Sequence, residues 1–234
     1  MTTSTRFIHT PKADSLLSKL TIHLPFSYLR IYKRSIGSPR TILDIGCGDG
    51  LLMKRLSQGE NWNITGIDIF DSSLKKARRT KAYKKLIKGD VVIIAQELVR
   101  KNAKFDTVFC SQVIEHITKK EGLKLLGAMD KLANERSVVA TPRGFMHQPE
   151  VFIKGNPYQY HKSGWSIEDF RECGYRVHGL GLKSSWSESG FSRGSNDIIV
   201  TLSVIVSYLM SPVVYLFPKL AAGVLCIKEI KNGR

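Results

Sequence analysis

The 234-residue chain is 42% hydrophobic and 24% charged, a balance that excludes a fibrous or largely disordered protein. Its length supports one sizeable α/β core and is too short for two full domains. The formal net charge of +16 favours polyanionic partners such as nucleic acid, an anionic membrane face or a phosphorylated substrate, although a basic, solvated surface gives the same value.

Residues 1–40 are expected to form a helical extension with basic flanks, broken at Pro25. Thr2–Lys12 is polar and lacks the apolar core of a secretory signal. Short apolar runs then alternate with helical stretches, which predicts βαβ units and a parallel sheet. Strands are expected at Thr41–Ile45, Asn63–Ile69, Leu86–Lys88, Phe105–Cys110 and Ser137–Thr141, and helices from Leu51 onward and at Ser72–Lys81, Val92–Lys101 and Gly122–Ala133.

The C-terminal part follows a loop rich in glycine, proline and aromatic residues after Pro142. A short helix is expected at Ser166–Glu172, a strand at Tyr175–Gly181 and a final strand at Ala222–Ile230. The four cysteines, Cys47, Cys110, Cys173 and Cys226, lie far apart and fit neither a zinc knuckle nor a disulfide framework. Their spacing favours a reducing, cytoplasmic compartment.

Ile198–Pro218 contains no charged residue and meets the length criterion for a membrane span. Pro212 interrupts it, and Ser203, Ser207 and Ser211 form a polar stripe at helical spacing. Only residues 218–221 would return the chain to its final strand, too few to recross roughly 30 Å of hydrocarbon. We therefore expect Ile198–Phe217 to be a lid or apolar helix, within about residues 184–218, attached to the core and able to contact a membrane peripherally.

The strongest motif is Ile42-Leu43-Asp44-Ile45-Gly46-Cys47-Gly48-Asp49-Gly50, where the first strand turns into its helix. Glycines there let the backbone approach a ligand closely, and ligands of open α/β sheets bind at this edge. A dinucleotide fingerprint would need a third glycine where Leu51 stands. Asp44 and Asp49 would repel a pyrophosphate but suit a ligand with a sulfonium and an ammonium group, such as S-adenosylmethionine.

Two further acids follow successive strands. Asp68, about 20 residues beyond the glycine turn, is placed to accept both hydroxyls of a ribose. Asp90, at the tip of the third strand, is placed to accept from an adenine amino group. Each acid alone could be a loop carboxylate or a helix N-cap, but their joint occurrence with the glycine turn indicates a nucleoside site.

Residues 42–141 resemble class I S-adenosylmethionine-dependent methyltransferases, through the turn above, the acid in Gly66-Ile67-Asp68-Ile69, the Gly89-Asp90 pair and Phe105-Asp106. The resemblance implies a doubly wound α/β domain over residues 41–234 with a seven-stranded, mostly parallel sheet, closed by an antiparallel pair from Tyr175–Leu182 and Ala222–Ile230. It implies that Gly46 and Gly48 hold the methionine end of the cofactor, Asp68 the ribose and Asp90 the adenine. The cofactor site is expected to comprise Asp44, Gly46, Cys47, Gly48, Asp68, Ile69, Asp90, Val91 and Ser111.

The segment Ser111–His116 resembles that of the broad small-molecule group that includes quinone-biosynthesis methyltransferases. It also resembles a segment of small-RNA 2′-O-methyltransferases whose acids and histidine bind a divalent metal, but Gln112 stands where the first acid would be. His147 or His161 could complete such a site. We expect no metal, with Glu115 capping the following helix and His116 packing or lining the pocket.

The loop Asn156–Trp165 follows the fifth strand, where this fold builds its acceptor pocket. Its tyrosines, histidine and tryptophan suit substrate recognition, or else form a plug that packs the loop down. His161 is the first candidate for a general base, with His116 second.

Three functions follow from these features. The first is methyl transfer to a small-molecule or lipid acceptor. The alternatives are an RNA methyltransferase drawn to its substrate by the basic charge, and a binding module that has kept the fold without catalysis. The absence of Asn-Pro-Pro-Tyr or Asp-Pro-Pro-Tyr after the fourth strand, and of a proline before Cys110, argues against adenine-amine and cytosine-C5 chemistry.

Overall fold

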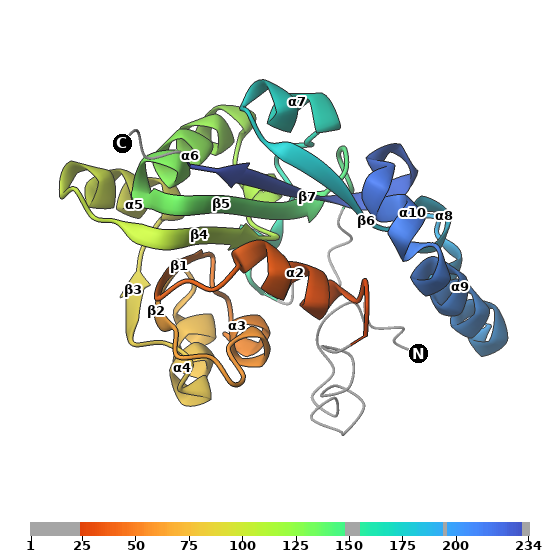
Figure 1. Cartoon of the computed structure of the whole chain (residues 1–234), viewed down its shortest axis with the longest axis horizontal. Helices are drawn as coiled ribbons and strands as arrows, with labels where there is room; N and C mark the ends of the chain where they lie inside the picture. Colours follow the sequence, from red (N-terminus) through yellow and green to blue (C-terminus); the bar gives the residue numbers. More distant parts are fainter. Residues whose placement is uncertain (1–23, 148–154, 194–195, 231–234) are drawn as a thin grey trace.

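The computed structural model describes residues 24–147, 155–193 and 196–230. Within these ranges one sheet of seven strands runs in the order β3-β2-β1-β4-β5-β7-β6, with helices on both faces (Figure 1). The strands are β1 Thr41–Ile45, β2 Asn63–Asp68, β3 Lys85–Lys88, β4 Phe105–Ser111, β5 Ala133–Pro142, β6 Arg176–Leu182 and β7 Ala221–Glu229. The helices are α2 Tyr28–Ile36, α3 Leu51–Leu56, α4 Asp71–Thr80, α5 Val91–Arg100, α6 Lys119–Leu132, α7 Ile167–Glu172, α8 Lys183–Trp186, α9 Asp197–Leu209 and α10 Ser211–Leu216.

Strands β1 to β5 pair in parallel, and β7 pairs antiparallel with both β5 and β6. The predicted doubly wound, mostly parallel sheet and its antiparallel closing pair are therefore confirmed. Ile45 pairs with Ile67 and with Cys110, so the carboxyl ends of β1, β2 and β4 meet at one edge. Loops that follow these strands converge there, which positions the site described below.

Two apolar layers hold the sheet. One face packs against α5, α6 and α7, with Trp165 and Phe170 fully buried among them. The opposite face packs against α2 and α3, where Tyr32 lies edge-on to Phe109 with ring centroids 5.7 Å apart. Burial on both faces explains why the inner strands are continuous apolar runs in the sequence.

The predicted elements are present, with shifts of a few residues at their ends. Strand β5 is the largest departure, because it begins at Ala133, directly after α6, and not at Ser137. The first residues of β5 include the polar Asn134 and Glu135, which interrupt the apolar run expected of a buried strand. Of the predicted N-terminal extension, α2 packs on the sheet, and residues 1–23 lie outside the described ranges.

The apolar stretch forms two helices, α9 and α10, joined at Met210. Pro212 lies in the first turn of α10, where its missing N–H removes no helical hydrogen bond. Helix α10 packs on β6, and α9 contacts α8 and the end of β6, as expected for an element attached to the core. No helix in the described ranges has the length and apolar character needed to cross a bilayer.

Candidate functional site

The glycine turn after β1 has the backbone that its sequence predicts. Gly46, Gly48 and Gly50 all have positive φ, at 70°, 54° and 76°. A Cβ on Gly46 would lie 2.2 Å from Val113 Cγ2, whereas a Cβ on Gly48 would meet nothing within 4 Å. Gly46 therefore permits close packing of the segment after β4, and Gly48 faces open space in which a ligand can approach the backbone.

A cluster of carboxylates surrounds this turn. Asp68 accepts from the Gly48 N–H through Oδ2 and from the Phe70 N–H through Oδ1, both over 2.8 Å. Asp44 is buried and accepts from the Tyr83 hydroxyl over 2.7 Å. Burial, and then the charge of Asp68, raises the pKa of Asp44 to about 7; burial also raises the pKa of Asp68.

Raised carboxyl pKa values mean that negative charge is disfavoured here until a cation arrives. A ligand with a sulfonium and an ammonium group supplies that cation, whereas a diphosphate would add to the repulsion. The chemistry of this donor set therefore fits S-adenosylmethionine. The sequence does not predict the contact of Tyr83 with Asp44, because Tyr83 is an isolated aromatic residue shortly before β3.

The other predicted cofactor positions lie at the same edge of the sheet. Asp90 is the N-cap of α5, and its Oδ1 accepts from the N–H groups of Val92 and Ile93. Asp90 therefore has the helix-capping role that the sequence analysis gave as the alternative to adenine binding. A contact between its other oxygen, Oδ2, and the adenine stays a prediction. Val91 is buried in the first turn of α5, and Ile69 is partly buried just after β2.

The segment after β4 packs directly on the glycine turn through Val113. Ser111 ends β4, and its Oγ is buried without a hydrogen-bond partner among the described residues. Gln112 has a φ of 56°, a left-handed conformation that is strained for a residue with a Cβ. Strained backbone conformations are common at functional sites. Here the conformation of Gln112 directs the residues that follow it back over the glycine turn.

Three polar side chains meet beside this segment. One ligand atom from each of Glu115, His116 and His161 lies within 4.8 Å of the others, and the two imidazole centroids are 4.8 Å apart. His116 Nδ1 faces Tyr160 O at 3.3 Å, and His161 Nδ1 faces Met146 O at 2.7 Å. Because a carbonyl oxygen only accepts, both Nδ1 atoms carry the proton and both Nε2 atoms keep a lone pair.

The electrostatics of this cluster keep both rings neutral. Burial lowers the pKa of His116 to about 4, and burial likewise lowers the pKa of His161. Burial raises the pKa of Glu115 to about 7; its Oε2 accepts from Thr141 Oγ1 over 2.9 Å and its Oε1 has no partner among the described groups. The cluster thus offers two unprotonated nitrogens and one unpaired carboxyl oxygen, a set that can accept a proton or bind a divalent cation.

The expected capping role of Glu115 is wrong. Helix α6 is capped by Thr118, whose Oγ1 accepts from the Glu121 N–H while Glu121 accepts from the Thr118 N–H. A capping box that starts three residues later, at Thr118, caps the helix instead, because Glu121 lies three residues after that threonine. Glu115 is thereby left in the interior. His147, the other histidine considered, contacts Glu188 through its backbone N–H and is not in the cluster.

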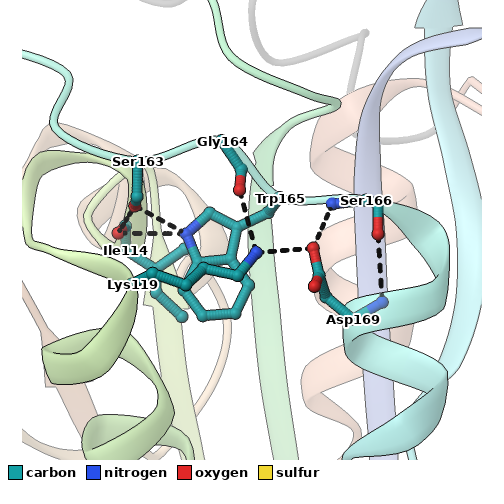
Figure 2. A network of polar contacts seen from close by, with 7 residues as sticks. All are labelled: Ile114, Lys119, Ser163, Gly164, Trp165, Ser166 and Asp169. Carbon is teal, nitrogen blue, oxygen red and sulfur yellow. Dashed lines mark hydrogen bonds and ion pairs between the residues drawn. The ribbon is translucent and has the colours of Figure 1, made fainter.

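His161 reaches His116 because the loop that carries it is fastened to the segment after β4. The N–H groups of Lys162 and Ser163 donate to Glu115 O over 2.8 and 3.1 Å. Figure 2 shows the adjoining contacts, in which Ser163 Oγ and Trp165 Nε1 both donate to Ile114 O over 3.2 Å. Every bond joins residues about 45 to 50 positions apart, so sequence spacing gives no sign of this juxtaposition.

A second set of contacts in Figure 2 fixes the end of the same loop to α6 and α7. Lys119 Nζ donates to Gly164 O over 2.9 Å and to Asp169 Oδ2 over 2.5 Å, and lies 3.9 Å from the centroid of the Trp165 ring. Trp165 is fully buried, whereas Tyr158 and Tyr160 are 45% and 44% exposed. The loop therefore divides into a buried tryptophan plug and exposed tyrosines that remain available to a substrate.

Comparisons with known proteins agree with this geometry. The methyltransferase domain family matches residues 43–139. Ubiquinone biosynthesis O-methyltransferase of Rickettsia akari is 30% identical over 106 residues, 45% of this chain and 38% of that protein. The human mitochondrial enzyme of the same name is 32% identical over 108 residues, 44% of this chain and 27% of that protein. The match thus spans well under half the length of these relatives.

Two solved structures share the fold. A SAM-dependent methyltransferase from Archaeoglobus fulgidus matches with a TM-score of 0.55 and 19% identity, covering 91% of this chain and 93% of that one. The small RNA methyltransferase HEN1 matches with a TM-score of 0.54 and 17% identity, covering 88% of this chain and 25% of that one. At these identities the matches establish a common architecture.

Proposed function

We propose that the chain, whose residues 43–139 match the methyltransferase domain family, transfers the methyl group of S-adenosylmethionine to a hydroxyl oxygen of a small, lipophilic acceptor. The observation that carries the proposal is the pair of histidines, His116 and His161, held beside the segment that packs on the glycine turn, with each Nδ1 facing a backbone carbonyl. A hydroxyl acceptor must lose a proton to react, and these are bases at the expected acceptor position.

In the proposed reaction the acceptor oxygen attacks the methyl carbon, and the carbon–sulfur bond breaks to release S-adenosylhomocysteine. The acceptor proton passes to Nε2 of His161, and the Nδ1–H bond to Met146 O stabilises the imidazolium that forms. Asp44 and Asp68 favour the cationic form of the cofactor over its neutral product. Alignment of the two reactants supplies much of the remaining rate.

The small, lipophilic acceptor is supported by two features. The matched relatives are named ubiquinone biosynthesis O-methyltransferases. In this chain, exposed apolar and aromatic side chains, including Phe145, Tyr158 and Tyr160, lie on the loops near the histidines. Such an acceptor places the enzyme in peripheral contact with a membrane, where lipophilic molecules concentrate.

The cluster with Glu115 also suits a divalent metal, which would bind the acceptor oxygen and lower the pKa of its hydroxyl. The residues that would hold it are Glu115, His116 and His161, and the unpaired Glu115 Oε1 fits that role. The same arrangement supports the second candidate function, ribose 2′-O-methylation of RNA, together with the net charge of +16.

The test is methyl transfer from tritiated S-adenosylmethionine to a catechol, a prenylated catechol, and extracted lipid and RNA fractions, each with and without a metal chelator. We expect incorporation into the prenylated catechol or the lipid fraction. His161→Ala should lower kcat at least about a hundredfold, the usual contribution of a general base, while cofactor affinity is unchanged.

His178→Ala is the matched control, because His178 stacks on Tyr215 away from the cluster. Incorporation into RNA alone would support the second candidate instead. Loss of activity on chelation, restored by Mg²⁺, would assign the cluster to a metal. Cofactor binding without transfer to any fraction would point to a binding module.

A further inference from the structure

Helix α9 turns its polar side inward. Ser207 Oγ accepts from the Leu182 N–H over 3.2 Å and from Trp186 Nε1–H over 2.7 Å. Ser185 Oγ donates to Ser203 O over 3.1 Å, and both Ser203 and Ser207 are buried. The serine stripe therefore packs against α8 and the end of β6, which leaves the aliphatic side chains of the helix to face outward.

The outward surface is large and almost wholly apolar. Ile198, Leu209 and Leu216 are 71%, 68% and 68% exposed. We call α9 and α10 together the apolar arm; its exposed large hydrophobic side chains are Ile198, Ile199, Leu202, Val204, Ile205, Val206, Tyr208, Leu209, Val213, Leu216 and Phe217. Monomeric proteins rarely leave a contiguous apolar surface of this kind without a partner.

The distribution of exposure around α9 indicates what that partner is. Only Val200, Ser203 and Ser207 are withdrawn from solvent, and they lie on one narrow side of the helix. A folded protein partner would cover one further face of α9 and leave its remaining apolar side chains exposed to water. A fluid hydrocarbon phase instead surrounds an apolar helix on every exposed side, so exposure around most of the circumference favours lipid over a protein partner.

The position of the apolar arm connects it with the site. Leu182, the last residue of β6, pairs with Ala221, the first of β7, and the arm joins them at the edge of the sheet where β5 ends. Because β5 and β6 run in the same direction as β1 and β4, this is also the edge that carries the glycine turn (Figure 1). An arm embedded in lipid would therefore bring the acceptor pocket to the membrane surface.

We propose that the apolar arm inserts into one leaflet of a lipid bilayer and docks the enzyme there without crossing it. Helix α9 has 13 residues and is about 20 Å long, less than the roughly 30 Å of hydrocarbon in a bilayer. The exposed Lys219 follows the apolar arm and suits an anionic headgroup, whereas the exposed Asp197 begins α9 and does not. The inference rests on the proposed function only where it assigns the docked enzyme a lipophilic acceptor drawn from that leaflet.

The test is flotation of the purified full chain with vesicles of phosphatidylcholine alone and of phosphatidylcholine with phosphatidylglycerol, at low and high salt. We expect binding that persists at high salt. The double substitution Leu202→Glu and Leu209→Glu should weaken partitioning at least about tenfold, because charged side chains are strongly disfavoured in hydrocarbon. Ile93→Glu with Leu123→Glu is the matched control, since both side chains are exposed hydrophobics on α5 and α6 and the charge change is the same.

Three results would overturn the proposal. Vesicle binding that is abolished by salt and equal in both double variants would assign docking to the basic surface alone. The wild-type protein could instead be a dimer in analytical ultracentrifugation that does not bind vesicles. If the Leu202→Glu and Leu209→Glu substitutions dissociated that dimer, the apolar arm would be a subunit interface. A monomer that ignores vesicles would refute docking outright. None of these assays contains cofactor or acceptor, so their failure is separate from failure of the proposed methyl transfer.

Discussion

Replacing Asp68 with alanine tests the cofactor site most directly. In the proposed complex its carboxylate accepts from both ribose hydroxyls, and hydrogen bonds to charged groups contribute about 1.5–3 kcal/mol, so affinity should fall at least about tenfold. The structure adds a second loss, because the same carboxylate accepts from the N–H groups of Gly48 and Phe70 over 2.8 Å. Asp68→Ala therefore also loosens the glycine turn, and the total effect on affinity should exceed that of the ribose contacts alone.

The two losses can be separated by isothermal calorimetry with S-adenosylhomocysteine and its 2′-deoxy analogue. Wild-type protein should bind the deoxy analogue more weakly than the parent, whereas Asp68→Ala should bind the two with nearly equal affinity. Thermal unfolding without ligand reports the loosened turn by itself. If folded Asp68→Ala binds S-adenosylhomocysteine as wild type does, or if it still discriminates fully between the two ligands, Asp68 does not bind the ribose.

The remaining predictions concern the turn, its charge and the loop. Gly48→Val should abolish cofactor binding in calorimetry while the protein still folds, because the new side chain fills the open space above a φ of 54°; normal binding would show that the ligand lies elsewhere. Burial raises the pKa of Asp44 to about 7, so its protonated form stabilises the ligand-free fold fully only below about pH 4. This contribution is lost as the pH rises through about 7. Asp44→Asn should therefore flatten the fall in the free energy of unfolding between these two pH values. An equal fall in both proteins would exclude Asp44 as its source. Trp165→Phe should cost about 2–3 kcal/mol in chemical denaturation and lower kcat more than cofactor affinity, because it removes the donor to Ile114 O that holds His161 in place; an unchanged kcat would show that the loop is held by other contacts.

The sheet and the glycine turn could be predicted from the sequence because their determinants are local. Apolar runs of strand length alternate with helical periods, and a glycine turn needs only its own residues to adopt positive φ. The sequence predicts a shorter β5 for the same local reason, since Asn134 and Glu135 interrupt the apolar pattern and lie at an irregularity in the pairing of β5 with β4.

The cluster of Glu115, His116 and His161 could be predicted only in part, because it depends on contacts between distant segments. His161 was singled out by its loop, and His116 by its motif, but nothing in their spacing brings them together. The juxtaposition comes from hydrogen bonds to Ile114 O and Glu115 O and from the burial of Trp165. The serine stripe of α9 was recognised, but which way it faces depends on the partners that α8 and β6 supply.

The strand order has a consequence for how the chain folds. Strand β5 pairs with β7, so that Val138 meets Ile227, and everything from the aromatic loop to the apolar arm lies between them in sequence. Pairs among β1 to β5 join residues at most about 65 positions apart, such as Ile42 with Thr107, whereas β5 and β7 must close a longer loop, which slows folding. Until β7 arrives, β5 presents an unpaired apolar edge and the arm is exposed beside it. This is the stage at which a chaperone or a membrane surface would best protect the nascent chain from aggregation.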